Sequence, residues 1–178
     1  AETVELEPGS LDAAALDLLR ERRLVGEPLP ERLFVSRDES LSLGVGTVDH
    51  LTLSGRISGT DVRGAFERVR AAERILEPRL NYAVSLDLGY LSAEITNLGT
   101  GLRVTTLLHL PALGATGRME ELAESIGPSE FVLVPDDSFN VDGDEATFYR
   151  LSNARTLGFE EDAIINKLED HARALVHY

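Results

Sequence analysis

The chain has 178 residues, of which 43% are hydrophobic and 27% are charged, a composition typical of a globular domain with a sizeable core. Its formal net charge of −14 disfavours binding to nucleic acid and to anionic membranes, because like charges repel. The absence of cysteine excludes disulfides, thiol nucleophiles and cysteine-ligated metals. No apolar run reaches the length of a membrane span and no signal-peptide pattern is present, so we expect a cytoplasmic protein.

Periodicity in the first half predicts two helices and several strands. Ser10 is the residue type that caps a helix, and Pro78 is the type that ends one. In chain order we expect a flexible lead-in at 1–9, a helix from Ser10 to about 24–26, strands at 33–36 and 41–45, continuing strand over 44–54, and a helix from Thr60 or Asp61 to about 78.

The second half predicts further short strands and two helices. In chain order we expect strand material at 82–91 and 102–110, a helix from Pro111 to about 126, strands at 131–134 and 146–152, and a helix over 159–176. Strands in hairpin-like groups interrupted by helices indicate an α+β fold with a mainly antiparallel sheet. We expect residues 1–178 to form a single domain.

A glycine-rich turn over residues 97–101 separates two apolar runs and is followed by Arg103. Glycine lets the backbone approach a ligand or another strand closely. Backbone N–H groups, the Thr100 hydroxyl and the Arg103 guanidinium together suit an anion such as phosphate. The alternative is that the turn only reverses the chain and that Arg103 pairs with an acid such as Glu94.

Several separate segments, in the right order, resemble the ATP:guanido phosphotransferases, and most of all the bacterial protein-arginine kinases. The segment YLSAEITNLGTGLRVTTLLHLPAL resembles the core signature of that family. The segments SRDESLSLGVGTVDHL, LNYAVSLDLGYL and YRLSNARTLGFEEDAIINKL are similar to further family segments, so the likeness spans about residues 33–174. The resemblance implies the antiparallel, glutamine-synthetase-like fold of a phosphagen kinase catalytic domain. It also implies phosphoryl transfer from Mg-ATP to a guanidinium nitrogen.

The positions that carry chemistry in the family are largely replaced in this chain. The cysteine beside the substrate nitrogen corresponds to Glu94, and the two glutamates of the Asn-Glu-Glu-Asp-His motif correspond to Thr47 and Val48. One nucleotide arginine corresponds to Thr52 and another, in a loop, to Pro135. By resemblance, the residual nucleotide-phosphate positions are Arg103, His50 and Thr100. For His50 a purely structural role is the alternative.

Three interpretations follow from these replacements. The first is a catalytically inactive, kinase-like domain with a binding or regulatory role and no cofactor. The second is an active protein-arginine or guanidino kinase that uses Mg-ATP and substitute carboxylates, drawn from Glu94, Asp136, Asp137, Asp142 and Asp144. The third is a calcium loop at Ser138, Asn140, Asp142 and Gly143, which lacks the glutamate expected at its twelfth position.

Two further expectations concern segments and partners. The family's Ser-Arg-x-Arg nucleotide motif and the C-terminal dimer region of the arginine kinases have no counterpart in this sequence. A protein partner or an arginine-containing protein, and an oligomer, are compatible with the sequence, whereas nucleic acid and membrane are not. We expect His109 to be structural, and His171 and His177 to lie at the surface of the last helix.

Overall fold

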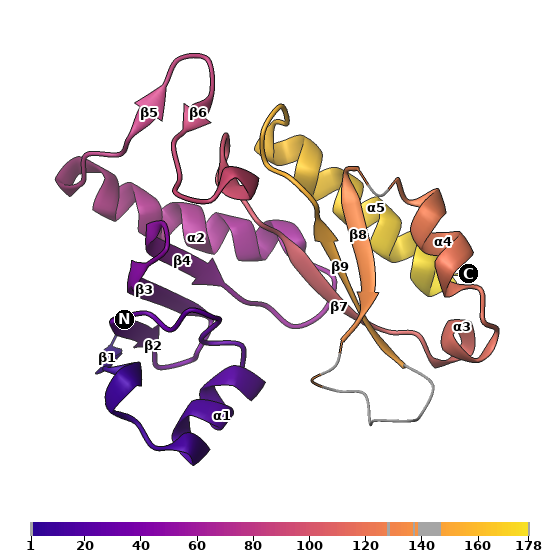
Figure 1. Cartoon of the computed structure of the whole chain (residues 1–178), viewed down its shortest axis with the longest axis horizontal. Helices are drawn as coiled ribbons and strands as arrows, with labels where there is room; N and C mark the ends of the chain where they lie inside the picture. Colours follow the sequence, from indigo (N-terminus) through magenta and orange to yellow (C-terminus); the bar gives the residue numbers. More distant parts are fainter. Residues whose placement is uncertain (1, 128, 137, 139–146, 178) are drawn as a thin grey trace. The chain divides into compact units, whose positions relative to one another are not determined.

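A computed structural model describes residues 2–127, 129–136, 138 and 147–177 of the chain (Figure 1). The backbone divides into two compact units, which comprise residues 1–82 and 83–178. Among the described residues, no helix has both the length and the apolar character needed to cross a membrane.

The first unit is built on a four-stranded antiparallel sheet in the order β1-β2-β3-β4. Alternation along β2 turns Leu33 and Val35 to one face, where they form a core with Leu19 and Leu24. The elements around this core are β1 (Thr3–Leu6), η1 (Pro8–Ser10), α1 (Ala13–Glu21), β2 (Arg32–Ser36), β3 (Leu41–Thr47) and β4 (His50–Gly55).

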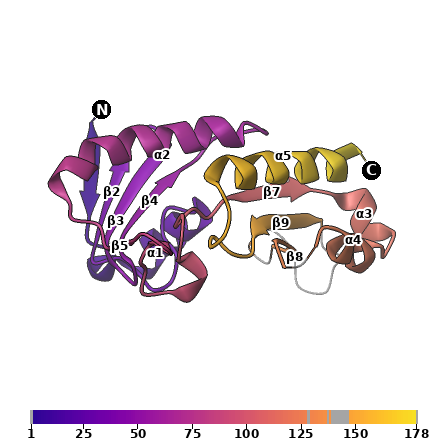
Figure 2. The same ribbon diagram turned by 90° about the horizontal axis from the view of Figure 1, so that it is seen from above.

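Helix α2 (Val62–Leu76) packs against β4, as Figure 2 shows, and is followed by η2 (Glu77–Arg79). The Asp61 side chain caps the helix by accepting a hydrogen bond from the Gly64 N–H at 2.8 Å, which confirms one of the two predicted caps. Close packing depends on Gly55, where an added Cβ would lie 2.7 Å from the Ala65 carbonyl oxygen. The helix therefore buries Phe66 and half-buries its neighbours on the same face.

The second unit contains a three-stranded antiparallel sheet in the order β7-β9-β8, with α5 packed on β7 and β9 (Figure 2). The apolar face of α5 is a large part of the core and buries Ile164, Ile165, Leu168, Ala172 and Leu175. The elements of the unit are β5 (Val84–Ser85), β6 (Gly89–Tyr90), η3 (Ile95–Asn97), β7 (Thr105–His109), α3 (Pro111–Ala115), α4 (Met119–Ser125), β8 (Phe131–Pro135), β9 (Phe148–Asn153) and α5 (Glu161–His177). The antiparallel pairing in both units confirms the predicted α+β class.

Four local expectations were wrong. Thr3–Leu6 is not a flexible lead-in but a strand that pairs with β2, and Asp12 rather than Ser10 caps α1, by accepting from the Ala15 N–H. The expected continuous strand over 44–54 is instead a hairpin with its turn at residues 48–49, between the paired Thr47 and His50. The helix expected from Pro111 to about 126 is two short helices, α3 and α4, separated at Gly117, which has a φ of 65°.

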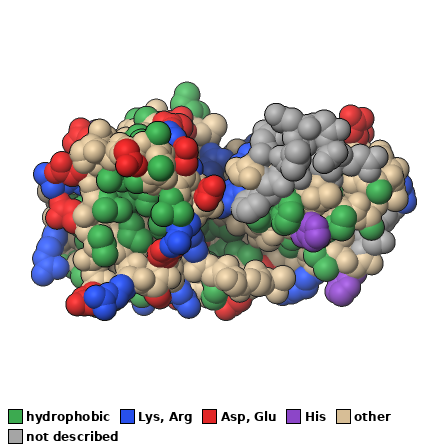
Figure 3. Space-filling model, turned by 90° about the horizontal axis from the view of Figure 1, so that it is seen from below, with side chains coloured by type: hydrophobic (Ala, Val, Ile, Leu, Met, Phe, Trp, Pro, Cys, Tyr) green, Lys and Arg blue, Asp and Glu red, His purple; other side chains and the backbone are tan. Residues whose placement is uncertain are grey.

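Several ion pairs lie on the surface of the first unit. Arg20 contacts Glu27 at 2.7 Å, Arg37 contacts Glu2 at 2.9 Å, and Arg32 contacts Glu7 at 3.1 Å. Figure 3 shows a face on which basic and acidic side chains lie interspersed around a group of apolar ones. Because these pairs are exposed to solvent, which screens their charges, each contributes little to stability.

Candidate functional site

The glycine turn predicted from the sequence lies in the second unit, between η3 and β7. Gly99 and Gly101 both have positive φ, of 106° and 64°, a conformation that favours glycine. Gly99 exchanges two hydrogen bonds with Tyr90, of 2.8 and 3.1 Å, so the turn is paired to the β5–β6 hairpin. An added Cβ on Gly99 would lie 2.9 Å from the Leu157 Cα. The close approach that requires glycine here is therefore to the chain itself.

Two fully buried polar side chains, Asn153 and Thr156, hold this turn in place. The Thr156 hydroxyl lies 2.6 Å from the Leu98 carbonyl oxygen and donates to it. The Asn153 side chain accepts from the Val104 N–H at 2.7 Å and donates to the Leu102 carbonyl at 3.0 Å. Because these groups are buried, each unmade bond would cost about 1–3 kcal/mol, and the turn has a well-defined geometry.

Arg103 is exposed and is held by groups of its own surroundings. Its guanidinium donates to the Asn97 Oδ1 at 3.0 Å and to the Asn153 carbonyl oxygen at 3.5 Å. Both acceptors are neutral, so these bonds orient the guanidinium without neutralising its charge.

Glu94 and Thr100 lie on the same loop as Arg103. Glu94 is exposed at the start of η3, and its carboxylate accepts from the Thr96 hydroxyl at 3.4 Å. The half-buried Thr100 hydroxyl accepts from the Leu102 N–H at 3.2 Å and lies 3.4 Å from the Thr156 carbonyl oxygen. The hydroxyl predicted to contact phosphate thus already has partners within the fold.

His50 belongs to the first unit, where it opens β4 as an exposed residue with a φ of 67°. Its backbone conformation is set by the two-residue turn before it, and the Leu51 N–H donates to the Asp49 carbonyl at 2.8 Å. The second unit holds the other three predicted residues, Glu94, Thr100 and Arg103.

The acidic segment after β8 was predicted to offer substitute carboxylates or a calcium loop. Asp136 has only 1% of its surface exposed, accepts from the Ser138 N–H at 3.1 Å and lies 3.8 Å from Arg150. Asp136 is therefore a structural group. The other members of both predicted sets in this segment, Asp137, Asn140, Asp142, Gly143 and Asp144, lie outside the described residues. Within the described part of the chain, no cluster of three or more His, Asp or Glu side chains could hold a metal ion.

The second unit contains five arginines, and four of them contact a neighbouring acid or aromatic ring. Arg118 contacts Glu121 at 3.3 Å, Arg150 lies 3.8 Å from Asp136, and Arg173 contacts Glu169 at 3.1 Å. The guanidinium of Arg155 lies 5.3 Å from the Phe159 ring centroid. Among the described residues, Arg103 is the one arginine of this unit whose hydrogen bonds go to neutral oxygens only.

Charge is distributed unequally between the two units. The second unit has sixteen acidic and six basic side chains, a formal net charge of −10, whereas fifteen acidic and eleven basic side chains give the first unit −4. The unit that holds Arg103 is therefore the more acidic of the two.

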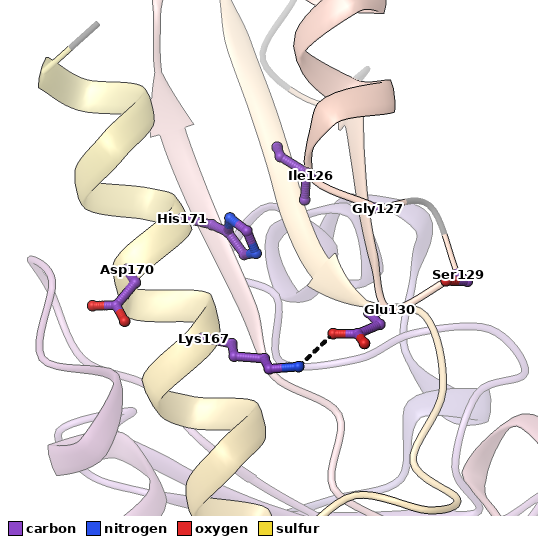
Figure 4. A pocket seen from close by; sticks show the side chains of 7 residues that line it. All are labelled: Ile126, Gly127, Ser129, Glu130, Lys167, Asp170 and His171. Atoms are coloured by element: carbon purple, nitrogen blue, oxygen red, sulfur yellow. Dashed lines mark hydrogen bonds and ion pairs between the residues drawn. The ribbon is translucent and has the colours of Figure 1, made fainter.

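A pocket that the sequence analysis missed lies between α5 and the chain that connects α4 to β8 (Figure 4). Lys167 and His171 reach it from α5, and Glu130 closes the opposite wall with an ion pair to Lys167 of 2.6 Å. This hydrogen bond from Lys167 is the main cause that lowers the pKa of Glu130. His171, predicted as a surface group, is half-buried with its ring 5.2 Å from Phe131. The available signal was the sole lysine followed by a histidine four residues later, on one helix face.

Comparisons with known proteins agree with one another. A family model described as the C-terminal catalytic domain of ATP:guanido phosphotransferase matches residues 24–178. A protein-arginine kinase of Symbiobacterium thermophilum is 34% identical over 174 residues, which is 93% of this chain and 48% of that protein. A protein-arginine kinase of Halothermothrix orenii is 35% identical over 139 residues, covering 77% of this chain and 39% of the relative. The chain thus spans about half the length, or less, of these relatives.

Solved structures show a similar fold at low sequence identity. A lombricine kinase superposes with a TM-score of 0.77 at 18% identity, covering 99% of this chain and 53% of that one. A substrate-free duplicated taurocyamine kinase from Schistosoma mansoni gives a TM-score of 0.79 at 19% identity, with coverage of 98% and 26%. The expected phosphagen-kinase-like fold is therefore confirmed.

Proposed function

The chain belongs to the ATP:guanido phosphotransferase family, and from this premise we propose that it is a catalytically inactive member that acts by binding. It is a protein-arginine-kinase-like domain. The proposed inactivity follows from the lack of charged groups that the chemistry of this family needs. Transfer of a phosphoryl group requires several cations around the phosphates, because charge on the transferred group must be neutralised.

The arginines of the second unit carry this proposal. Four of the five arginines contact a neighbouring carboxylate or an aromatic ring of the same unit. Among the described residues, the contacts of Arg103 are to neutral acceptors only. Each charge-assisted hydrogen bond to phosphate is worth about 1.5–3 kcal/mol. A single guanidinium therefore supplies only a fraction of the affinity that a triphosphate obtains from an arginine cluster.

Electrostatics of the loop and of the whole unit add to this argument. Glu94 places a carboxylate on the same loop as Arg103, at the position where the family resemblance places a cysteine. The formal net charge of the second unit is −10, and this charge repels a polyanion such as a triphosphate. These residues do not fit Mg-ATP, and we assign no step of the proposed function to it.

The experiment is a phosphotransfer assay with the 178-residue chain, Mg-ATP and an arginine-rich protein, with phosphoarginine detected by ³¹P NMR. A protein-arginine kinase in the same buffer is the positive control. The proposal predicts no phosphoarginine above the level of a reaction without the chain. Phosphoarginine that forms with the wild-type chain and disappears with Arg103→Ala would contradict it, because a contaminating kinase would not respond to that substitution.

The second candidate, an active kinase with substitute carboxylates, is favoured by one observation. The Glu94 carboxylate is exposed and could hold a guanidinium of the substrate. Asp136 offers no such help, since it is buried and lies close to Arg150. In the assay above, an active enzyme of this kind would lose phosphoarginine formation with Glu94→Gln as well as with Arg103→Ala.

The charge of the second unit also suggests what the domain binds. A unit with a formal net charge of −10 attracts arginine-rich segments of other proteins. We therefore propose an arginine-containing protein as the partner. Fluorescence anisotropy should show binding of a labelled oligoarginine peptide that weakens steeply with salt, and no binding of an oligoglutamate peptide of equal length. Equal binding of both peptides, or of neither, would contradict this assignment.

A further inference from the structure

The pocket of Figure 4 lies wholly within the second unit and has a volume of about 480 Å³. This volume is within the range of roughly 300–1,000 Å³ that small-molecule sites occupy. Its polar groups come from two sides, because Lys167 and His171 project from α5 and Glu130 stands at the start of β8. Ile126 and Gly127, which directly follow α4, also line it. The pocket contains none of the residues predicted from the sequence as nucleotide positions.

Asp170 borders the pocket without facing into it. Figure 4 shows its carboxylate directed away from Glu130 and His171, and Arg173 donates to it at 3.4 Å. The charges that converge on the space are therefore one cation, Lys167, and one anion, Glu130. Both are partly open to solvent, with 47% and 36% of their side chains exposed, so a ligand can reach them.

A second, smaller hollow of about 120 Å³ adjoins the first and shares Ile126 and His171 with it. Its further lining is mainly apolar, from Leu122, Ala174 and Leu175. Residues 167, 171 and 174–175 follow one face of α5, so this helix presents a charged group, an imidazole and an apolar surface in succession. The combined space thus has a charged mouth and an apolar end.

We propose that this pocket binds a free α-amino acid with a branched apolar side chain. The ammonium group contacts Glu130, the carboxylate contacts Lys167 with His171 beside it, and the side chain enters the smaller hollow. An amino acid inserted between Lys167 and Glu130 replaces one ion pair by two, so that no charge loses its partner. A simple anion would leave Glu130 without a cation, and a simple amine would leave Lys167 without an anion. The inference holds whether or not the chain transfers phosphate.

The test is an NMR titration of the ¹⁵N-labelled chain with L-leucine and with its two singly charged analogues, 3-methylbutylamine and 4-methylpentanoate. Leucine should shift the amide signals of residues 126, 127, 129, 130 and 167–175 in a saturable manner. The affinity for each analogue should be lower than that for leucine by a factor of at least about ten, because each analogue lacks one charge-assisted bond. Lys167→Met and Glu130→Gln should each lower the affinity for leucine by a similar factor.

Arg20→Met is the matched control. Arg20 forms an exposed ion pair with Glu27 of 2.7 Å, much like the Lys167–Glu130 pair, but it lies in the first unit and does not line the pocket. This variant should bind leucine as the wild type does. The proposal is overturned if shifts stay unsaturated or absent at about 10 mM leucine, where a millimolar ligand is mostly bound. It is equally overturned if either analogue matches leucine, or if Arg20→Met weakens binding as much as Lys167→Met.

Discussion

At the scale of single residues, Thr156 is one of the two buried polar groups that hold the glycine turn. It is 1% exposed, and its hydroxyl lies 2.6 Å from the Leu98 carbonyl and 3.1 Å from that of Thr96. Next to the glycine turn in the sequence stands Arg103, whereas Thr156 is more than fifty residues away. A threonine whose partners are about sixty positions away leaves no local pattern, because the contacts exist only after β9 has paired with β7.

Thr156→Val tests this role with a change that preserves the shape of the side chain. The variant leaves the Leu98 carbonyl oxygen without the hydroxyl that donates to it, so the free energy of unfolding should fall by about 1–3 kcal/mol. Urea denaturation measures the effect. Thr116→Val is the control, since Thr116 is exposed and its hydroxyl only contacts the Leu113 carbonyl within the same helix end. Equal losses in the two variants would show that Thr156 has no special role.

Asp38, in the turn between β2 and β3, has a pKa lowered to about 2. The main cause is the hydrogen bond from the Ser36 hydroxyl at 2.7 Å, assisted by the Ser40 hydroxyl at 2.8 Å. A lowered pKa means that the folded state favours the carboxylate. The stabilisation is present above the ordinary pKa of 3.8 and is lost as the pH falls through about 2.

NMR titration of the Asp38 carboxyl carbon should give a midpoint near pH 2 in the wild type. In Ser36→Ala the midpoint should move upward towards 3.8, because the largest cause of the shift has been removed. Ser125→Ala, which removes a hydroxyl bonded to the Leu122 carbonyl in α4, should leave the midpoint unchanged. A wild-type midpoint of about 3.8 would show that the two serines do not hold the carboxylate.

At the scale of elements, sequence patterns located most helices and strands but failed where a break was local or a partner was distant. β1 was assigned to a flexible lead-in because its periodicity is weak, and it becomes a strand only by pairing with β2, some thirty residues away. The turn at residues 48–49 and the break at Gly117 were missed because the flanking residues continue the same apolar pattern. Amphipathic α5 was predicted well, since its buried residues recur with the helical period.

The glycine turn separates two effects of glycine that sequence cannot distinguish. Gly99 and Gly101 both have positive φ, but an added Cβ meets the Leu157 Cα at 2.9 Å only at position 99. At position 101 its nearest neighbour would be the Asn97 carbonyl oxygen at 3.8 Å, an ordinary contact. Gly99 is thus needed for both conformation and space, and Gly101 for conformation alone.

Gly101→Ala should therefore cost about 1–2 kcal/mol of unfolding free energy, the strain of a left-handed residue. Gly99→Ala should cost clearly more, because the backbone at Leu157 must also move. Thermal or urea denaturation of the two variants provides the comparison, and each serves as the control for the other. If Gly101→Ala proves the more damaging, the packing of the turn on Leu157 is not what the glycine provides.

At the scale of the whole molecule, sequence resemblance indicated the family and the fold, and the comparisons bear out both. The candidate site was only partly predictable. The replaced positions, such as Glu94, are visible in the sequence, but the contacts that occupy the arginines of the second unit are not. The sequence carries a signal only for the α5 side of the pocket, at Lys167 and His171, because Glu130 on the other side is thirty-seven residues from Lys167 along the chain.

Charge is the property of the whole molecule that supports the proposed function. The net charge of −14 falls mainly on the second unit, where Arg103 has neutral partners and the remaining arginines contact acids or an aromatic ring. Such a charge disfavours a nucleotide and favours cationic protein segments, so the proposed inactivity and the proposed binding role have the same physical origin.

Isothermal titration calorimetry of the 178-residue chain with Mg-ATP tests this claim most directly. We predict no measurable heat of binding below millimolar nucleotide, because one guanidinium on an acidic unit cannot offset the repulsion of a triphosphate. Micromolar binding that Arg103→Ala abolishes would contradict the account.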